Sequence, residues 1–218
     1  MRFEDWEPIY LEIVKEFGFS VEEDREAAFV LSGLLDDERR LSDTEKRLRD
    51  IISGKSCIII GPCFDSVATD EILSDEDNAS ALIATVGEGT ENFFDSGNVP
   101  GMIFTDLDSY PESELLACEK GSIVFIHAHG DNIYLLKEWV PRFPRNVVPT
   151  CQCRPIQGIN NWGGFTDGDR AYCTLRHFQA QTIRLIGFDF RKPCGRKNVS
   201  AAVKMKKLEW AEKIIGIA

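Results

Sequence analysis

The sequence lacks the long apolar runs of a membrane protein, and we expect no secretory leader. Nowhere in its 218 residues does an apolar stretch approach the roughly 18 residues that indicate a membrane-spanning helix. The segment Met1–Glu7 is too acidic and too poor in apolar side chains for a signal peptide. We therefore expect a cytoplasmic protein without a membrane partner.

Cysteine pairs at CxxC spacing are also missing. The chain has seven cysteines, an odd number that does not suit a disulfide framework. Cys151 and Cys153 form a CxC pair, but on a strand both thiols would point to one face, and such a pair alone is weak evidence for zinc. We therefore predict buried or half-buried free thiols.

A surplus of basic residues is absent as well. The formal net charge is −11 at pH 7, which disfavours nucleic acids and anionic membranes as partners, because both require a basic surface. Seven of the 25 basic residues crowd together between Arg191 and Lys207. This segment is either an ordinary solvated face or the place where an anionic substrate docks.

What the sequence does contain is the composition of a globular protein, with 43% apolar and 28% charged residues. Residues 1–53 are predicted to form three amphipathic helices. The second and third follow capping-box signals at Ser20–Glu23 and Ser42–Glu45. We expect this segment to pack as a helical extension on a main domain formed by residues 54–218.

Residues 54–218 alternate between short apolar runs and helical segments. The predicted strands are 57–60, 81–86, 102–105, 123–126, 147–150 and 183–186, and the predicted helices lie near 66–73, 112–119, 132–140, 168–180 and 200–215. Continuously apolar strands separated by helices are typical of parallel sheets that are covered on both faces. The predicted fold is therefore α/β, with a doubly wound, mostly parallel sheet.

Two acidic residues, Asp106 and Asp108, follow the third predicted strand. They are two positions apart, so an extended strand end places both carboxylates on one side. Like charges held close together are costly unless a cation lies between them, and carboxylate oxygens suit Mg²⁺ or Mn²⁺. The carboxyl ends of parallel strands form the ligand crevice, so we expect these acids to meet the polar segments that follow other strands. The alternative is that they are helix-capping or ordinary loop acids.

Two histidines and an aspartate follow the fourth predicted strand, as His127, His129 and Asp131. The spacing resembles part of the HxHxDH motif of metallo-β-lactamase-type hydrolases, but Asn132 replaces the last histidine and the chain has only 3 histidines. A dinuclear zinc site of that type needs more imidazoles, so we do not predict one. Either the histidines flank a substrate, with Asp131 as a metal or phosphate-side acid, or they are satisfied within a buried turn.

The segment Gly163–Ala171 is the densest in candidate ligand-binding residues. Its paired glycines, including Gly164, let backbone approach a ligand closely. Asp167 or Asp169 would cap the following helix, whose N-terminal amides attract phosphate, and Arg170 offers a forked donor to phosphate oxygens. The alternative is a capped loop with an exposed arginine.

Together these segments resemble the archaeal 6-hydroxymethyl-7,8-dihydropterin diphosphokinase family. The similarity runs in the same order over most of the chain, and the strings HAHGDN at 127–132 and GGFTDGDRA at 163–171 are specific. The other matching pieces are Trp6–Tyr10, Phe17-Gly18, Gly61-Pro62, Thr105–Asp108, Gly187–Phe190 and Lys206–Ala211. The layout is also similar to that of thiamin pyrophosphokinase.

The resemblance implies a Mg²⁺-dependent enzyme of folate or methanopterin biosynthesis. The enzyme would transfer diphosphate from ATP to 6-hydroxymethyl-7,8-dihydropterin, whose own hydroxyl attacks the β-phosphorus while AMP leaves. The resemblance is also compatible with a homodimer. Asp106, Asp108 and Asp131 would hold the metal and serve catalysis. The residues implied to bind ATP and its phosphates are Gly61, Pro62, Gly164, Arg170, Lys192, Lys197 and Lys207. Those implied to bind the pterin are His127, His129, Asn132, Asp167, Asp169 and Asp189.

Three other functions remain open on the sequence alone. The acceptor could be thiamin, because the residues do not reveal the acceptor pocket. A DxD pair suits a metal-bound nucleotide sugar equally well, which allows a glycosyltransferase. A non-catalytic nucleotide-binding module is the third alternative.

Overall fold

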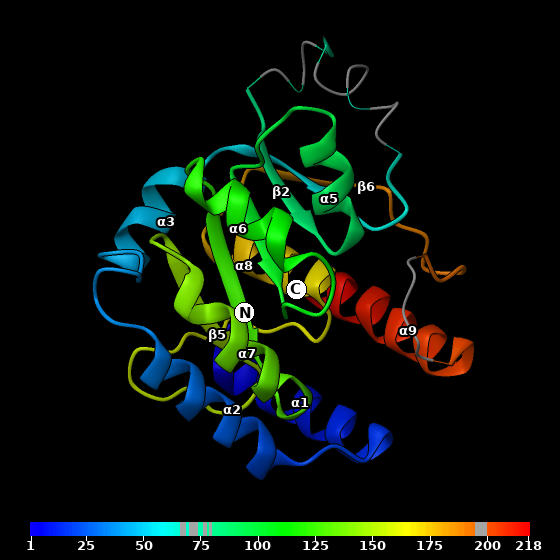
Figure 1. The fold of residues 1–218 in the computed structure, drawn as a ribbon. Coiled ribbons are helices and arrows are strands. Elements are labelled where there is room, and N and C mark those ends of the chain that lie inside the picture. The colour runs from blue at the N-terminus through cyan, green and yellow to red at the C-terminus, as the bar shows by residue number, and fades with distance from the viewer. Residues whose placement is uncertain (66–68, 70–73, 76–77, 79, 195–199) are drawn as a thin grey trace.

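A six-stranded sheet forms the centre of the molecule in the computed structural model, which describes residues 1–65, 69, 74–75, 78, 80–194 and 200–218. The strand order is β5-β4-β3-β2-β1-β6, and all neighbouring strands are parallel. The strands are β1 (Ser56–Ile60), β2 (Leu82–Val86), β3 (Met102–Thr105), β4 (Ile123–Ala128), β5 (Val147–Cys151) and β6 (Thr182–Ile186). The predicted parallel α/β sheet is thus confirmed (Figure 1).

Helices connect the strands and cover the sheet. They are α1 (Phe3–Phe17), α2 (Val21–Leu34), α3 (Thr44–Ile52), α5 (Glu88–Asp95), α6 (Pro111–Glu119), α7 (Ile133–Trp139), α8 (Asp167–His177) and α9 (Ala201–Ile217), with short 3₁₀ turns η2 (Gly130–Asn132) and η3 (Val140–Arg142). The helix predicted near 66–73 falls largely outside the described residues. No helix within the described part of the chain is long and apolar enough to cross a membrane.

The two larger of three hydrophobic clusters in the described part of the chain lie on opposite faces of the sheet. Successive strand residues point to opposite faces, so Ile103 packs in one cluster and its neighbour Met102 in the other. Residues of α2, α6 and α7 complete the first cluster, and residues of α3 and α8 complete the second. Burial of β3 and β4 on both faces explains why their sequences are continuously apolar.

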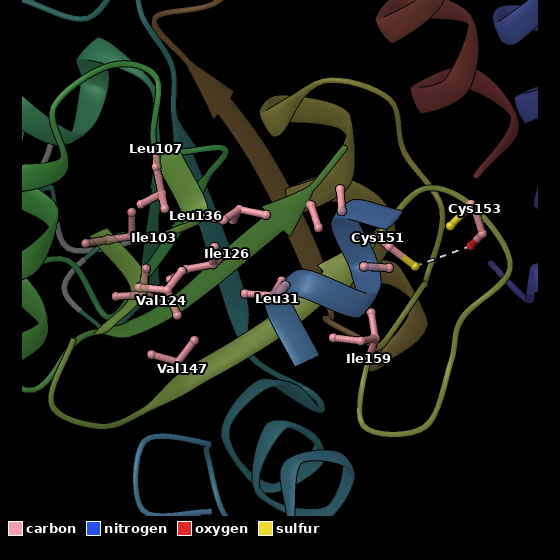
Figure 2. Packing of buried hydrophobic residues seen from close by; sticks show 14 of the residues in the cluster. Leu31, Ile103, Leu107, Val124, Ile126, Leu136, Val147, Cys151, Cys153 and Ile159 are labelled. Carbon is pink, nitrogen blue, oxygen red and sulfur yellow. Dashed lines mark hydrogen bonds between the residues drawn. The ribbon is translucent and has the colours of Figure 1, made fainter. Parts of the chain in front are cut away.

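The three predicted N-terminal helices are present and belong to these same clusters. Leu31 of α2 packs against the sheet beside Ile126 and Val147 (Figure 2). Helix α2 begins as the capping signal predicts, because the Ser20 hydroxyl accepts a hydrogen bond from the Glu23 N–H at 3.2 Å. The N-terminal segment therefore shares the core of the sheet domain.

The structure corrects one prediction about the cysteines. Cys63 and Cys194, which are 131 residues apart, form a disulfide, whereas the odd number of cysteines led us to predict free thiols only. They lie in the loops that follow β1 and β6, and these strands are neighbours in the sheet, so the fold brings the two loops together. The other five cysteines are free and buried, as predicted, including Cys151 and Cys153 (Figure 2).

Candidate active site

Two neighbouring cavities open at the carboxyl edge of the sheet. The first, which we call the carboxylate chamber, has a volume of about 190 Å³ and lies at the ends of β3, β4 and β5. It is lined by Phe19, Ser20, Glu23, Asp24, Asp106, Asp108, His129, Gly130, Asp131, Gln152, Phe165, Thr166, Asp167, Arg170, Lys204 and Lys207. The prediction that the acids after β3 and β4 meet the start of α8 at one edge is therefore confirmed.

The second cavity, which we call the apolar chamber, lies at the ends of β1, β2 and β6 and has a volume of about 180 Å³. Its walls include Pro62, Val86, Glu88, Phe188, Asp189, Phe190, Pro193, Leu208 and Ile215. Thr166, Asp167, Lys204 and Lys207 line both cavities, so these four residues form a shared wall. The two chambers together span the whole carboxyl edge of the sheet.

The turn after β3 is held from below by a short chain of hydrogen bonds. The Leu107 N–H donates to the Thr105 hydroxyl oxygen at 2.8 Å, and that hydroxyl donates to the Glu114 carboxyl group of α6 at 2.9 Å. Leu107 has a positive φ of 65° and a buried side chain, so it anchors the turn in the core. The backbone N–H of Asp108 donates to the Asp106 carboxylate at 3.2 Å. These contacts fix the aspartates at the rim of the carboxylate chamber.

Glu114 is a buried carboxyl group directly beneath this turn. Its side chain is fully buried, and its Oε1 atom has no hydrogen-bond partner among the described residues. Burial raises the pKa of Glu114 to about 8. The hydrogen bond from Thr105 lowers this pKa, whereas the negative charges of Asp167, Asp106 and Asp108 raise it further. The group therefore retains its proton at neutral pH.

Asn132 organises the loop after β4. Its Oδ1 atom accepts from the His129 N–H at 3.0 Å, and its Nδ2 atom donates to the carbonyl oxygens of His127 at 2.7 Å and Asp106 at 2.9 Å. The side chain is buried and does not line either chamber. Asn132 thus ties the β3 and β4 loops together, and the substrate contact that the resemblance implies for it stays a prediction.

The two histidines of this loop occupy different environments. His129 lines the carboxylate chamber, with its Nε2 atom 3.5 Å from the Asp106 carboxylate. His127 is only 2% exposed and lies below the chamber. Burial, and next the charge of Arg170, lower the pKa of His127 well below its ordinary value, so it is neutral. Its Nδ1 atom lies 3.0 Å from the Thr150 hydroxyl, and that hydroxyl donates to the Ile126 carbonyl at 3.2 Å, so His127 links β4 to β5.

The start of α8 separates the two chambers. Asp169 is buried and accepts hydrogen bonds from the N–H groups of Phe165 at 2.6 Å and Thr166 at 2.8 Å. The N-cap is Thr166 and Asp169 is the third residue of α8 in a capping box, so neither Asp167 nor Asp169 is the N-cap that the sequence predicted. The Arg170 guanidinium donates to the Phe165 carbonyl at 2.6 Å and pairs with Asp167. Gly164 has a φ of 100°, and a Cβ there would lie 2.5 Å from the Arg170 backbone, so only glycine fits. Arg170 is therefore a buried brace of this loop as well as part of the chamber wall.

The predicted basic residues divide into those that reach the site and those that do not. Lys207 lines both chambers, and its Nζ atom lies 5.5 Å from the centre of the Phe165 ring. Lys204, one turn earlier on α9, lines both chambers too, although the sequence singled it out only as part of the basic segment. Lys192 is exposed and lines neither chamber, and Lys197 lies outside the described residues.

Asp24 is a functional candidate that sequence reasoning missed. It belongs to α2, lines the carboxylate chamber and is 3% exposed. Its carboxylate accepts from the Tyr10 hydroxyl at 2.7 Å, the Gln152 amide at 2.8 Å and the Gly130 N–H at 2.9 Å. The only sequence signal was an aspartate at a position of α2 that faces the core. The contacts show that the N-terminal helices build one wall of the chamber.

The donor set of the carboxylate chamber fits Mg²⁺ that binds together with phosphate. Mg²⁺ takes one or two carboxylates, keeps several waters and accepts phosphate oxygens as further ligands. Asp106, Asp108 and Asp131 supply such carboxylates around one cavity. Within the described residues, no three side chains of His, Cys, Asp or Glu form a preformed metal cluster. The arrangement therefore suits a metal–phosphate complex and does not suit a closed all-protein cage.

Known proteins resemble this chain over nearly its full length. It is 33% identical to a 6-hydroxymethyl-7,8-dihydropterin pyrophosphokinase of Methanocaldococcus jannaschii, over 99% of this chain and 95% of that protein. Proteins of the same name from Pyrococcus furiosus and Methanothermobacter thermautotrophicus are 36% and 30% identical, and 93% and 94% of their lengths are covered.

Residues 38–193 match the family described as 6-hydroxymethylpterin diphosphokinase MptE-like. This range includes the strand ends that border both chambers and the start of α8. This finding agrees with the family that the sequence motifs resemble and does not support the thiamin or glycosyltransferase alternatives. The chain belongs to the MptE-like 6-hydroxymethylpterin diphosphokinase family.

Proposed function

We propose that this chain transfers diphosphate from ATP to the hydroxymethyl group of 6-hydroxymethyl-7,8-dihydropterin, with Mg²⁺ as cofactor, and releases AMP. The observation that carries the proposal is the carboxylate chamber, in which three aspartates from the ends of β3 and β4 line the same cavity as two lysines of α9. Family membership and the names of the relatives support the acceptor and the type of transfer.

The protein's task in this reaction is to position and to neutralise charge. The substrate's own hydroxyl is the nucleophile, so no protein nucleophile is needed. Lys204 and Lys207 bind the phosphate chain along the shared wall. The Arg170–Asp167 pair holds the start of α8 in place beside it. When bound to Asp106, Asp108 and Asp131, Mg²⁺ supplies further neutralisation of the phosphate oxygens.

His129 is placed to support this arrangement. Its imidazole lies against Asp106 at the chamber rim, so it orients that carboxylate. The neutral His127 below it holds the end of β4 through Thr150. In this proposal the two histidines act on the loop that carries the aspartates, and neither takes part in covalent chemistry.

An assay of the nucleotide product tests the proposal directly. The protein is incubated with ATP, Mg²⁺ and the dihydropterin, and a parallel reaction contains thiamin as acceptor. We expect AMP in amounts equal to the pyrophosphorylated pterin and no product with thiamin. Formation of ADP as the sole nucleotide product, or transfer to thiamin alone, would overturn the proposal.

A further inference from the structure

The carboxylate and apolar chambers differ in the chemistry that they offer to a flat ring. Both open at the same edge of the sheet and they have similar volumes, about 190 Å³ and about 180 Å³. An enzyme that transfers diphosphate from a nucleotide to a second heterocycle has two such rings to place. The lining of each chamber therefore indicates which ring it takes.

The apolar chamber offers mainly carbon surface. Phe188 and Phe190 contribute two rings whose planes lie at 24° with centroids 6.1 Å apart, and α9 adds Leu208 and Ile215. The Phe188 ring is wedged between the end of β1 and the start of α8, since a Cβ at either Gly61 or Gly168 would lie 2.6 Å from it. This fixed aromatic wall suits a base whose recognition depends on stacking and apolar contact, such as adenine.

The carboxylate chamber combines aromatic walls with hydrogen-bond acceptors. Phe19 and Phe165 line it, and their ring centroids are 6.2 Å apart. Glu23 and Asp24 of α2 lie in the same wall, together with Gln152. A pterin presents a flat ring with an amino group and ring N–H groups along one edge, and carboxylates accept such hydrogen bonds strongly. Asp24 already accepts three hydrogen bonds within the protein, so Glu23 is the carboxylate of α2 that is better suited to accept from this edge.

The shared wall links the two chambers through positive charge. Lys204 and Lys207 line both cavities, so a phosphate chain that starts in one chamber reaches the other along α9. The aspartates of the β3 and β4 loops border only the carboxylate chamber. An ATP molecule whose nucleoside lies in the apolar chamber thus extends its β- and γ-phosphates toward these aspartates and toward the acceptor.

From this arrangement we propose that the chambers divide the two substrates, a division that rests on the proposed function. The apolar chamber binds the adenine nucleoside of ATP, and the carboxylate chamber binds the pterin, with Glu23 accepting hydrogen bonds from its amino edge. The N-terminal helices thereby determine acceptor specificity. The segment from β6 through α9 determines the binding of the nucleotide.

Binding measurements with two separate probes test the division. AMP reports on the nucleoside site without the β- and γ-phosphates, and 6-hydroxymethylpterin reports on the acceptor site. Phe190→Ala is expected to weaken AMP binding about tenfold and to leave pterin binding within about twofold. Glu23→Gln is expected to weaken pterin binding about tenfold and to leave AMP binding unchanged. Leu208→Ala provides a second variant of the apolar chamber if Phe190→Ala does not fold.

Two matched control variants remove a carboxylate and a phenyl ring at positions that line neither chamber. Glu22→Gln changes the neighbouring, exposed carboxylate of α2, and Phe29→Ala removes a 57% exposed ring from the same helix. Both controls should bind both probes normally. The division of substrates is wrong if Phe190→Ala weakens only pterin binding and Glu23→Gln only AMP binding, or if one variant weakens the binding of both probes equally. Either result leaves the proposed function standing. A wild-type protein that binds AMP but no pterin overturns the proposed function, and the division with it.

Discussion

At the residue scale, the carboxylates around the chamber differ in how the protein surrounds them. Asp108 and Asp131 are exposed at the rim, where solvent and ligands reach them. Glu114 lies fully buried beneath the same loop, with one hydrogen bond from Thr105. Rim carboxylates are suited to bind a cation, whereas a buried carboxyl group with a single donor favours the protonated state. The two kinds should respond differently to removal of their charge.

Replacement of a rim aspartate by asparagine tests the metal-binding role. Asp108→Asn or Asp131→Asn retains the size of the side chain and should leave the fold intact. Turnover should fall by a factor of about 30 or more, in line with about 2–4 kcal/mol for one electrostatic contributor in a preorganised site. Raising the Mg²⁺ concentration should restore part of the activity. Thermal melting without metal should be unchanged or slightly higher, because less like charge remains in the chamber.

A control variant, Asp50→Asn, removes an exposed carboxylate from α3 and should keep full activity. The metal assignment fails if the rim variants melt at lower temperature while activity per folded molecule stays normal. That result would make the aspartates structural loop residues.

Glu114→Gln should change how stability depends on pH. The folded-state pKa is about 8, above the ordinary 4.5, so between these values the folded protein keeps a proton that the unfolded chain has released. Stability that is present at low pH is therefore lost as pH rises toward the folded pKa. Glutamine can accept the Thr105 hydrogen bond and does not titrate. The melting temperature of the variant should therefore rise relative to that of the wild type as the pH increases from about 5 to about 8.

The matched control for this measurement is Glu112→Gln, an exposed carboxylate on the same helix. Its melting temperature should follow the wild-type pH dependence. An equal pH profile for wild type and Glu114→Gln would show that Glu114 is ionised in the folded protein.

At the scale of secondary-structure elements, the sheet was predictable and one helix was not. Strands β1 to β5 are buried almost throughout, so their sequences are largely apolar, whereas the edge strand β6 is only partly buried and carries the exposed Arg184. The predicted bounds of all six strands lie close to the observed ones. Helix α5 was missed because its eight residues include Gly89 and Thr90 and show only a short periodic pattern. Short helices between strands depend on tertiary packing more than on local preference.

The candidate site was predictable only where it follows a strand. Asp106, His129 and Asp131 lie directly after β3 and β4, so topology alone places them at the ligand-binding edge. Asp24 lies far away in sequence and reaches the site because α2 packs against β4, β5 and η2. Helical periodicity predicts which face of α2 is buried, but it does not reveal that a loop N–H, a tyrosine and a glutamine meet that face.

Asp24→Asn tests how strongly these contacts hold α2 against the loops of the site. All three partners of the carboxylate are donors, so an asparagine amide would place its own N–H₂ against one of them. We expect a loss of about 2–3 kcal/mol in unfolding free energy, because a buried donor is left unsatisfied. Denaturant titration measures this loss. Asp37→Asn, an exposed change just after α2, should cost almost nothing, and equal stability of the two variants would contradict the role of Asp24.

At the scale of the whole molecule, the site depends on contacts between distant parts of the chain. The N-terminal helices supply a wall of the carboxylate chamber, and α9 at the opposite end of the sequence supplies the shared lysines. The Cys63–Cys194 disulfide joins the loops after β1 and β6, and both cysteines line the apolar chamber. A cross-link over 131 residues restricts the unfolded chain strongly, so it should contribute to global stability.

The disulfide makes a prediction that can be checked without any assay of function. Alkylation of the denatured, unreduced protein should modify five of the seven cysteines, because two are paired. Cys63→Ser with Cys194→Ser should lower the free energy of unfolding by on the order of 2–4 kcal/mol, since the unfolded state regains freedom. A reductant should lower the melting temperature of the wild-type protein toward that of the double variant and should leave the double variant unchanged. Modification of all seven cysteines, together with no effect of the reductant, would show that the loops after β1 and β6 are held by packing alone.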